Sequence, residues 1–305
     1  MKKVFIDGSA GTTGLRIFER LQTDKELELI TLNEKDRKDP ACRKQALNLA
    51  DIAILCLPDD AAREAAGWVL NPNTVVLDTS TAHRTAPGWV YGFPELGPDQ
   101  KEAIIHAGRV ANPGCHATGF LSTAAPLVKL GILPRDYPVT VYSLTGYSGG
   151  GKKMIAEYED ENRDPRHESD RIYATSLTHK HLPEMRKLCG LTKKPVFSPI
   201  VGDFYAGMAT SVLLPGVDAQ RAWEALSDHY AGQKLVSVAP LGGDEPVIYA
   251  DTYAGKDTMR IQVSGQQDQC MVTAIFDNLG KGASGAAIQN MNLLLGLEET
   301  TGLSL

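Results

Sequence analysis

The sequence has no apolar run that approaches the ~18 residues a membrane-spanning helix needs. Lys2 and Lys3 stand near its start, but the apolar stretch after them ends at Asp7, too early for a signal peptide. The chain also shows no internal repeat and no low-complexity tract. We therefore expect a cytoplasmic protein that has no membrane partner.

The sequence contains few cysteines and has fewer basic than acidic residues. The five cysteines form an odd set without paired spacing, which argues against a disulfide framework or a zinc site. The net charge of −6 argues against nucleic acid as the main partner. What remains is a soluble globular composition, with 43% hydrophobic and 22% charged residues. A length of 305 residues allows one large domain or two ordinary ones.

The N-terminus predicts a nucleotide-binding turn. Residues 4–7 form a strand-like run, segment 8–14 reads GSAGTTG, and apolar residues then recur at helical spacing up to Leu21. A strand, a glycine loop and a helix in this order bring backbone N–H groups close to a pyrophosphate. No lysine follows Gly14, so a nucleoside-triphosphatase loop is disfavoured.

Cofactor choice stays open on the residues alone. The second predicted strand, 27–32, ends before Glu34, and an acid near this place often binds the ribose 2′-hydroxyl of NAD. Lys35, Arg37 and Lys38 follow directly, and these cations could equally meet the 2′-phosphate of NADP. A solvated charged loop is the ordinary alternative for all of these residues.

Strand-like and helix-like segments alternate up to residue 112. The runs 51–57 and 74–77 predict buried parallel strands, and 61–70 predicts a helix between them. This alternation favours a Rossmann-type doubly wound parallel sheet, whose ligands bind at the carboxyl ends of the strands. Cys56 lies at such an end and is expected to be a wall residue of the site.

The chain is organised around Asn112-Pro113-Gly114-Cys115. A short strand precedes this turn, and residues 118–130 carry apolar side chains at helical spacing. A cysteine at a helix entry meets unpaired N–H groups and the positive end of the helix dipole, which favour a thiolate. The alternative is a buried structural cysteine, and the turn alone does not decide between the two.

The second half of the chain changes pattern and predicts an α+β domain with a mixed or antiparallel sheet. Three consecutive glycines, 149–151, predict a flexible loop. His179 and His181 lie two residues apart and are the best candidates for a proton acceptor beside a nucleophilic cysteine. His116 is a poorer candidate, because the helix is expected to turn its side chain away. The small residues after Lys281 predict a closely packed C-terminal helix.

These motifs occur together in one order, which spans nearly the whole chain. They are GSAGTTG at 8–14, the Asp78-x-Ser80 loop with Arg84, YGFPEL at 91–96, NPGC at 112–115, GYSGGG at 146–151, HxHxPE at 179–184 and KGASG at 281–285. The set resembles N-acetyl-gamma-glutamyl-phosphate reductase in its shorter (type 2) form, within the superfamily shared with aspartate-semialdehyde dehydrogenase. One departure is His116-Ala117, where many members have Tyr-Pro.

The resemblance implies an NADP-dependent reductase of arginine biosynthesis that acts on an acyl phosphate. The Cys115 thiolate would form a thioester, NADPH would reduce that thioester, and His179 would handle the thiol proton. The resemblance also implies a homodimer or homotetramer. The predicted nucleotide domain covers 1–112 and is completed by a helix in 283–305, and 113–282 forms the catalytic and oligomerisation domain.

The resulting site prediction has three parts and no metal. The catalytic residues are Cys115 and His179. The predicted substrate-binding residues are Arg84, Asn112, Ser148, His181 and Glu184. The predicted cofactor-binding residues are Gly8, Ser9, Gly11, Thr12, Thr13, Gly14, Cys56, Leu57, Pro58, Ser80 and Asn290. Two rival functions remain: an aspartate-semialdehyde dehydrogenase, and a dinucleotide-binding regulator in which Cys115 is inert packing.

Overall fold

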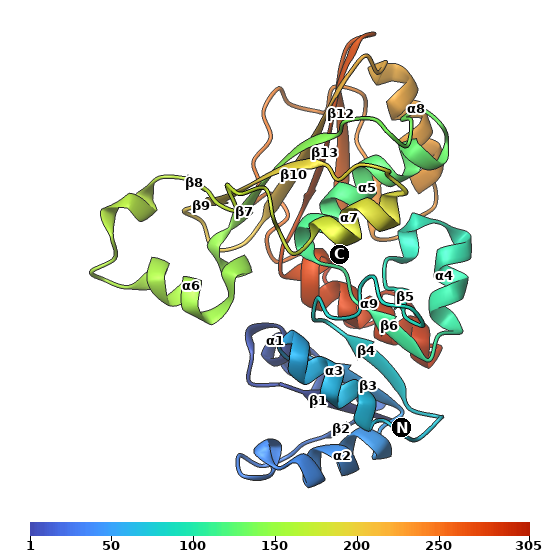
Figure 1. The fold of residues 1–305 in the computed structure, drawn as a ribbon, viewed down its shortest axis with the longest axis vertical. Helices are drawn as coiled ribbons and strands as arrows, with labels where there is room; N and C mark the ends of the chain where they lie inside the picture. The colour runs from blue at the N-terminus through green and yellow to red at the C-terminus, as the bar shows by residue number, and fades with distance from the viewer. The chain divides into compact units, whose positions relative to one another are not determined.

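A computed structural model describes all of residues 1–305, which fold into two compact units. Unit 1 comprises Met1–Pro94, Pro98–Pro113 and Ala283–Leu303, and unit 2 comprises Glu95–Gly97, Gly114–Gly282 and Ser304–Leu305. Figure 1 follows the chain from its blue N-terminus to its red C-terminus. The chain passes from unit 1 to unit 2 between Pro113 and Gly114. This point lies inside the turn Asn112-Pro113-Gly114-Cys115, which we call the cysteine turn. None of the helices is long and apolar enough to span a membrane.

Unit 1 contains a parallel sheet of six strands in the order β2-β1-β3-β4-β6-β5. Their bounds are β1 Lys2–Asp7, β2 Leu27–Ile30, β3 Ile52–Leu55, β4 Val75–Asp78, β5 Val90–Tyr91 and β6 Arg109–Ala111. The chain adds β2 on one side of β1 and then crosses to add β3 on the other. The carboxyl ends of β1 and β3 therefore flank a topological switch point, where such sheets bind ligands.

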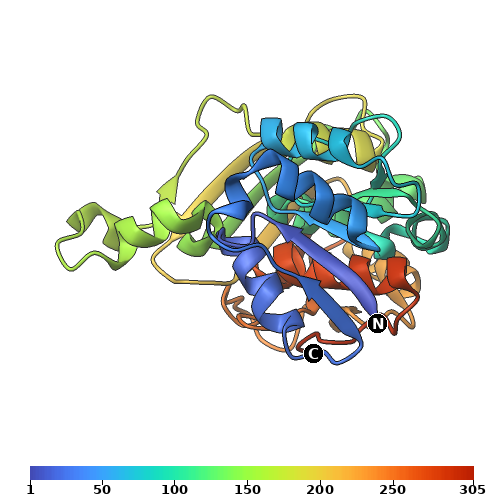
Figure 2. The same cartoon turned by 90° about the horizontal axis from the view of Figure 1, so that it is seen from below.

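Helices cover both faces of this sheet. They are α1 Thr12–Leu21, α2 Pro40–Leu49, α3 Asp59–Trp68, α4 Pro98–Ile105 and α9 Gly285–Leu295. Successive strand residues point to opposite faces, so Val4 packs with α1, α4 and α9 while Phe5 packs with α2 and α3. Figure 2 shows the red α9 across the strands from α2 and α3. The predicted doubly wound fold is confirmed.

Unit 2 contains a mixed sheet of seven strands in the order β11-β12-β13-β10-β7-β9-β8. Their bounds are β7 Thr140–Gly146, β8 Arg171–Ile172, β9 Val196–Gly202, β10 Met208–Pro215, β11 Val236–Val238, β12 Met259–Gly265 and β13 Gln269–Phe276. Four helices belong to this unit: α5 Cys115–Lys129, α6 Gly151–Glu159, α7 Leu182–Cys189 and α8 Ala219–Tyr230. The predicted α+β architecture is confirmed.

Helix α5 is the central helix of unit 2 and is almost wholly buried from His116 to Leu127. It packs on β10 and β13 and contacts α7 and α8. The apolar spacing predicted a helix from residue 118, but α5 begins at Cys115. The first turn carries no apolar pattern, so periodicity could not detect it.

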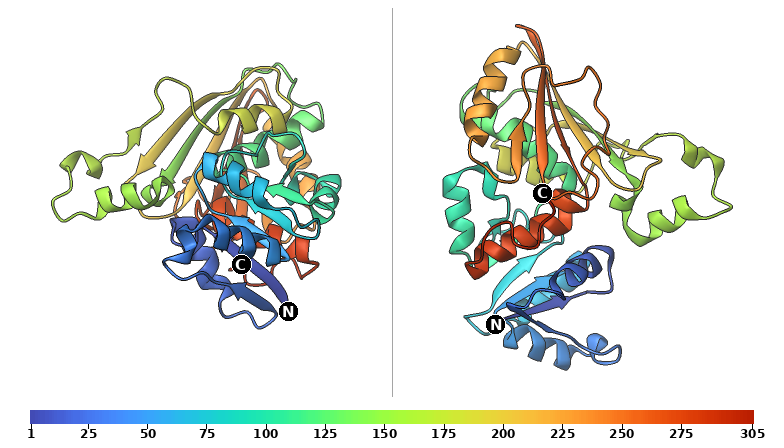
Figure 3. Two further views of the ribbon diagram at one scale, coloured as in Figure 1. Left: turned by 60° about the horizontal axis from the view of Figure 1, so that its bottom comes forward. Right: turned by 180° about the vertical axis from the view of Figure 1, so that it is seen from behind.

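The segment between β7 and β8 stands off from the rest of unit 2 in both views of Figure 3. Its three glycines do not form the open loop that the sequence predicted. Residues Tyr147–Gly150 form a 3₁₀ turn, and α6 Gly151–Glu159 follows it directly. Gly151 has a φ of 71°, which glycine adopts at little cost, so the triplet makes a sharp corner instead of a flexible tract.

Candidate active site

The glycine turn after β1 is packed too closely for a side chain at Gly8 or Gly14. Gly8 has a φ of 90°, and a Cβ there would lie 2.3 Å from the carbonyl oxygen of Cys56. A Cβ on Gly14 would lie 2.5 Å from the carbonyl oxygen of Gly8. The turn is closed by the N–H of Gly11, which donates to the Gly8 carbonyl at 3.0 Å. This geometry gives the close backbone approach that a pyrophosphate-binding turn requires.

The N-terminus of α1 is open to an anion. Its N-cap, Gly11, makes no side-chain cap, and its first turn contains no acidic residue. The first turn of α3, in contrast, begins with Asp59 and Asp60. Asp59 accepts hydrogen bonds from both the N–H and the hydroxyl of Thr81. Because unpaired N–H groups and the helix dipole attract phosphate, α1 is the better phosphate site.

A pocket of about 720 Å³ lies beside this turn at the carboxyl ends of β1 and β2. Of the eleven predicted cofactor-binding residues, Gly8, Ser9 and Leu57 line it. Three cationic side chains also line it, namely those of Arg37, Lys38 and Arg43. Arg43 forms an ion pair with Asp7, with its Nη2 2.9 Å from Oδ2.

Glu34 does not line this pocket. Its carboxylate is largely exposed and pairs with Arg37 at 2.9 Å. The acidic residue expected near a ribose 2′-hydroxyl is therefore turned toward solvent, while two of its basic neighbours line the pocket. A pocket wall of this charge suits a 2′-phosphate better than a free hydroxyl.

Two predicted cofactor residues outside the glycine turn, Ser80 and Asn290, form hydrogen bonds within unit 1. Ser80 donates through Oγ to Asp78 at 2.7 Å, and the same carboxylate oxygen lies 2.6 Å from His83 Nδ1. Asn290 is fully buried and donates to the carbonyl of Gly92 and to Asn112 Oδ1. Neither Ser80 nor Asn290 lines the pocket.

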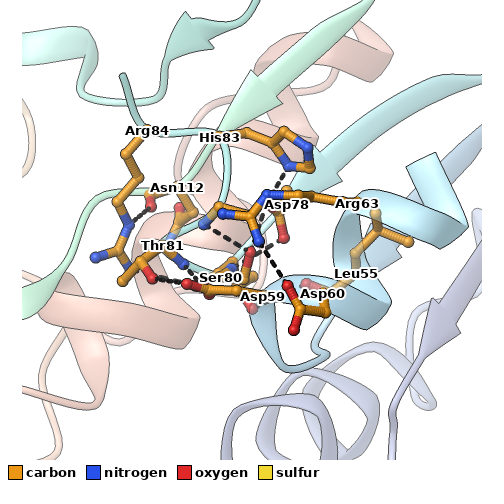
Figure 4. Close-up of polar contacts among 12 residues, drawn as sticks. Leu55, Asp59, Asp60, Arg63, Asp78, Ser80, Thr81, His83, Arg84 and Asn112 are labelled. Carbon is orange, nitrogen blue, oxygen red and sulfur yellow. Dashed lines mark hydrogen bonds and ion pairs between the residues drawn. The ribbon is translucent and has the colours of Figure 1, made fainter. Parts of the chain in front are cut away.

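Figure 4 shows how the loop after β4 presents Arg84. The Asp78 carboxylate accepts from the N–H of Ser80 as well as from its hydroxyl, which fixes the start of the loop. Arg84 donates through Nε to the carbonyl oxygen of Asn112 at 2.9 Å and through Nη2 to that of Thr79 at 3.2 Å. Arg84 is thus held against the strand end that leads into the cysteine turn.

Gly8→Ala is expected to lower the free energy of unfolding by at least ~2 kcal/mol, because it combines a left-handed φ with a clash against backbone. The measurement is urea unfolding of both the variant and a Gly67→Ala control. Gly67 lies in α3 with open space around it, so alanine there should be neutral or stabilising by ~1 kcal/mol. Equal stabilities for the two variants would contradict the packing described for the glycine turn.

In unit 2, Cys115 is the first residue of α5. The N-cap Gly114 provides no side-chain cap, and the first turn of α5 contains no acidic residue. A cysteine in this position meets the positive end of the helix dipole, which favours the thiolate. Gly282 packs against it, because a Cβ there would lie 3.0 Å from the Cβ of Cys115.

The other four thiols are poor nucleophiles by comparison. Burial raises the pKa of Cys56, Cys189 and Cys270 to about 12. The hydrogen bond from Cys42 to Asp39 raises the pKa of that thiol as well. Since only the thiolate attacks, these cysteines stay largely unreactive at neutral pH.

The predicted histidine pair lies in an aromatic cluster of unit 2. The ring centroids of His179 and His181 are 4.7 Å apart. The prediction that α5 turns His116 away is wrong, because its ring centroid lies 5.4 Å from that of His179 and 5.7 Å from that of His181. His116 directly follows Cys115 in α5, and its side chain points toward His179 and His181.

The two predicted histidines differ in their surroundings. The N–H of His181 donates to Nδ1 of His179 at 3.1 Å, so in the neutral ring the His179 proton is assigned to Nε2. His181 precedes α7 as its N-cap residue and is 95% buried. His179 therefore has a defined donor nitrogen, which suits a group that gives and retakes a proton.

Glu184 and Ser148, both predicted to bind substrate, make contacts within unit 2. Glu184 is buried on α7, and its Oε2 accepts from the N–H of Gly114 at 3.2 Å. This contact fixes the cysteine turn from the side of α7. Ser148 is also buried, and its Oγ accepts from Asn278 Nδ2 at 3.0 Å.

Sequence reasoning missed three residues of these sites. Arg43 lies in the middle of α2, where no motif marks it, and it lines the pocket through the packing of that helix. Tyr173 lies 2.7 Å from His116 Nε2, measured from its hydroxyl. His116 itself was set aside. The sequence carries no local signal that places His116 beside the histidine motif, because the two segments meet through tertiary packing.

Comparisons with known proteins identify relatives that match nearly the full length of the chain. A family model described as semialdehyde dehydrogenase, NAD binding domain, matches residues 3–104. A second, described as semialdehyde dehydrogenase, dimerisation domain, matches residues 115–278. N-acetyl-gamma-glutamyl-phosphate reductase of Sinorhizobium fredii is 49% identical, covering 96% of this chain and 98% of that protein. The reductase of Burkholderia ambifaria is 46% identical, with 96% of each chain covered.

Solved structures support the fold. Aspartate semialdehyde dehydrogenase II of Vibrio cholerae, complexed with ASA, aligns with a TM-score of 0.70 at 18% identity, covering 97% of this chain and 98% of that one. The Candida albicans aspartate semialdehyde dehydrogenase with NADP aligns with a TM-score of 0.65 at 16% identity, with 97% and 98% covered.

Proposed function

Because the chain belongs to the N-acetyl-gamma-glutamyl-phosphate reductase family of semialdehyde dehydrogenases, we propose that it catalyses the reaction of that family. The reaction reduces N-acetyl-L-glutamyl 5-phosphate to N-acetyl-L-glutamate 5-semialdehyde, with NADPH as reductant and phosphate as a product. It is a step of arginine biosynthesis.

One observation carries the chemical part of this proposal. Cys115 begins α5 at an N-terminus that has neither a side-chain cap nor an acidic first turn, whereas the pKa of each of the other four thiols is raised. A single thiol of this kind in the chain is what covalent catalysis at an acyl group requires.

In the proposed reaction, the Cys115 thiolate attacks the acyl carbon, the bond from that carbon to the phosphate oxygen breaks, and phosphate leaves. This step forms a thioester. NADPH, when bound, would supply the hydride for reduction of the thioester carbon. The carbon–sulfur bond then breaks, which frees the aldehyde and restores the thiolate. The N–H groups at the start of α5 are suited to stabilise negative charge on the acyl oxygen, and His179 holds or returns a proton through Nε2.

The pocket of unit 1 fits a phosphorylated dinucleotide. Gly8 and Gly14 leave no room for a Cβ, so their backbone can approach a pyrophosphate, and the α1 N-terminus is uncapped. Arg37 and Lys38 line the pocket where a 2′-phosphate would add negative charge. We therefore propose NADP, with Arg37 and Lys38 selecting it over NAD.

The double variant Arg37→Ser/Lys38→Ser is expected to raise the Kd for NADPH by roughly 10- to 100-fold, because charge-assisted contacts contribute ~1.5–3 kcal/mol. The Kd for NADH should change less than threefold. Fluorescence titration of both cofactors measures the two constants. Lys35→Ser is the control, because Lys35 lies next to these residues outside the pocket wall. Equal losses for NADPH and NADH would contradict the assignment.

The remaining substrate-site residues stay predictions. Arg84 carries a guanidinium suited to phosphate or carboxylate, and Asn112, Ser148 and His181 stand at the motif positions of the family. Glu184 also accepts a hydrogen bond from the Gly114 N–H, and we assign it the role of a positioning residue for the cysteine turn.

We infer a homodimer or homotetramer built on unit 2, with residues 113–282 as the catalytic and oligomerisation domain. Tyr142 and Leu144 alternate along β7 with the buried Val141 and Ser143, so they lie on the sheet face away from α5. Leu213 is 38% exposed on the neighbouring strand, where its partner is Met271. This apolar face is the surface that we assign to subunit contact.

The decisive assay compares acyl phosphates. Purified protein with NADPH should reduce N-acetylglutamyl phosphate and leave aspartyl phosphate largely unreacted. Preference for aspartyl phosphate would favour the aspartate-semialdehyde dehydrogenase alternative. Tight NADPH binding without reduction of either substrate would favour the regulator.

A further inference from the structure

A buried chain of hydrogen bonds runs from the residue after the cysteine to the loop that carries His179. His116 Nδ1 lies 2.8 Å from Ser143 Oγ, which in turn lies 2.7 Å from Thr210 Oγ1. On the other side of the ring, His116 Nε2 lies 2.7 Å from the hydroxyl of Tyr173. His116, Ser143 and Thr210 are each at least 97% buried. Both nitrogens of the ring therefore have a hydroxyl partner.

His116 stays neutral at physiological pH. Burial is the main cause that lowers its pKa to about 3, and the charges of His179 and Lys180 act in the same direction. A neutral imidazole has one donor and one acceptor nitrogen, and a hydroxyl can fill either role. The ring can therefore keep both hydrogen bonds without charging, which suits a structural link and not a proton acceptor.

Tyr173 joins this link to His179. Its ring centroid lies 5.9 Å from that of His179, and burial raises the pKa of its hydroxyl, with the negative charge of Cys115 as a further cause. Tyr173 is therefore within electrostatic reach of the cysteine and stays protonated. Its N–H donates to the carbonyl of Pro199 at 3.1 Å, which ties it to β9.

The loop from Tyr173 to His179 is under backbone strain. Ala174 has a φ of 52° and Leu177 a φ of 55°, and these are the only non-glycine residues of the chain with positive φ. Such conformations cost ~1–2 kcal/mol each and persist only where the surroundings hold them. The Tyr173 hydroxyl bond to His116 and the Tyr173 N–H bond to Pro199 restrain one end of this loop, and the His181-to-His179 bond restrains the other. Within the loop, the Leu177 N–H donates to the carbonyl of Ala174 at 2.9 Å.

We propose that His116 is a positioning residue, which holds the strained loop 173–179 through Tyr173 and so keeps His179 in place for the proton transfer. This inference rests on the proposed function. It gives the residue after the nucleophile a role of its own, since α5 then fixes Cys115 and the proposed acid/base together.

Tyr173→Phe tests the link with the loss of one oxygen atom. We expect kcat to fall roughly 10- to 100-fold, as for other displaced catalytic groups, with the KM for both substrates changed less than threefold. His116→Phe should have a similar effect, and the double variant should be no worse than the more damaged single variant.

Tyr158→Phe is the matched control. Tyr158 is a buried tyrosine of the segment between β7 and β8, and its hydroxyl has no hydrogen-bond partner. Loss of that hydroxyl should leave kcat unchanged. A role for Tyr173 in packing alone predicts equal kcat values for the two phenylalanine variants, and that result would overturn the proposal. Effects of His116→Phe and Tyr173→Phe that multiply in the double variant would overturn it too.

A second measurement needs no substrate. Iodoacetamide labelling at neutral pH, mapped by mass spectrometry, gives the rate at Cys115 relative to Cys42 in the same molecule. Because a nearby imidazole raises the thiolate fraction, we expect this ratio to fall several-fold in Tyr173→Phe and to stay constant in Tyr158→Phe. An unchanged ratio in Tyr173→Phe would overturn the proposal.

Inactive wild-type protein would refute the proposed function, whereas the labelling ratio would still test the link. Tyr173→Phe alone suffices if His116→Phe does not fold.

Discussion

Cys115→Ser is expected to reduce turnover of the acyl phosphate at least ~10³-fold and to leave the Kd for NADPH unchanged. The serine hydroxyl has the same place at the start of α5 but stays protonated there, and a neutral hydroxyl is a weak nucleophile without a strong base. Binding should survive because the cofactor pocket belongs to unit 1, whereas Cys115 belongs to unit 2. Steady-state kinetics and fluorescence titration measure the two effects separately.

Cys42→Ser is the control for this substitution. Cys42 is a half-buried residue of α2 whose thiol pKa is raised, and it has no place in the proposed chemistry. Its variant should keep the wild-type kcat. Substantial residual turnover in Cys115→Ser, above a tenth of the wild-type rate, would refute a covalent role for Cys115.

His179→Asn is expected to lower kcat by ~10²–10⁴-fold, the usual contribution of a general acid/base. Asparagine can still accept the hydrogen bond from the His181 N–H that now reaches His179 Nδ1, so the local turn should persist. The measurement is kcat as a function of pH. Loss of the acid/base should also remove the part of the pH dependence of kcat that this group causes.

His181→Asn separates the two histidines of the motif. His181 is the N-cap residue of α7 and is buried, so its loss should act mainly through stability and substrate KM. A loss of kcat confined to His181→Asn, with His179→Asn near wild type, would reverse the assignment of the acid/base.

The sequence predicted the parts of this fold that depend on local pattern. Apolar runs predicted β1, β2, β3, β4 and β6 and the helices α1, α3 and α9 of unit 1, and the glycine spacing at 8–14 predicted its turn, because these features depend on residues close together in the chain. The sequence did not predict α2, α4 or β5. The sequence placed Cys115 at a helix entry, and α5 does begin there, although its apolar periodicity starts only at residue 118 because an N-terminal turn needs no apolar face. The glycines 149–151 were predicted to form a flexible loop, but Gly149 and Gly150 end a 3₁₀ turn and Gly151 begins α6.

Contacts between distant segments could not be predicted in the same way. Arg43 lines the cofactor pocket through the docking of α2, a property of tertiary packing. The link between His116 and Tyr173 joins residues 57 positions apart. Sequence spacing also does not determine whether Glu34 or its basic neighbours line the pocket, because that depends on which of their side chains turn inward.

The most direct test of the account is the mass of the protein after mixing with N-acetylglutamyl phosphate in the absence of NADPH. The account predicts a gain of one N-acetylglutamyl group per chain, released by hydroxylamine and mapped to the peptide that contains Cys115. An unmodified chain under conditions where NADPH supports rapid turnover, or an acyl group on any other residue, would contradict it.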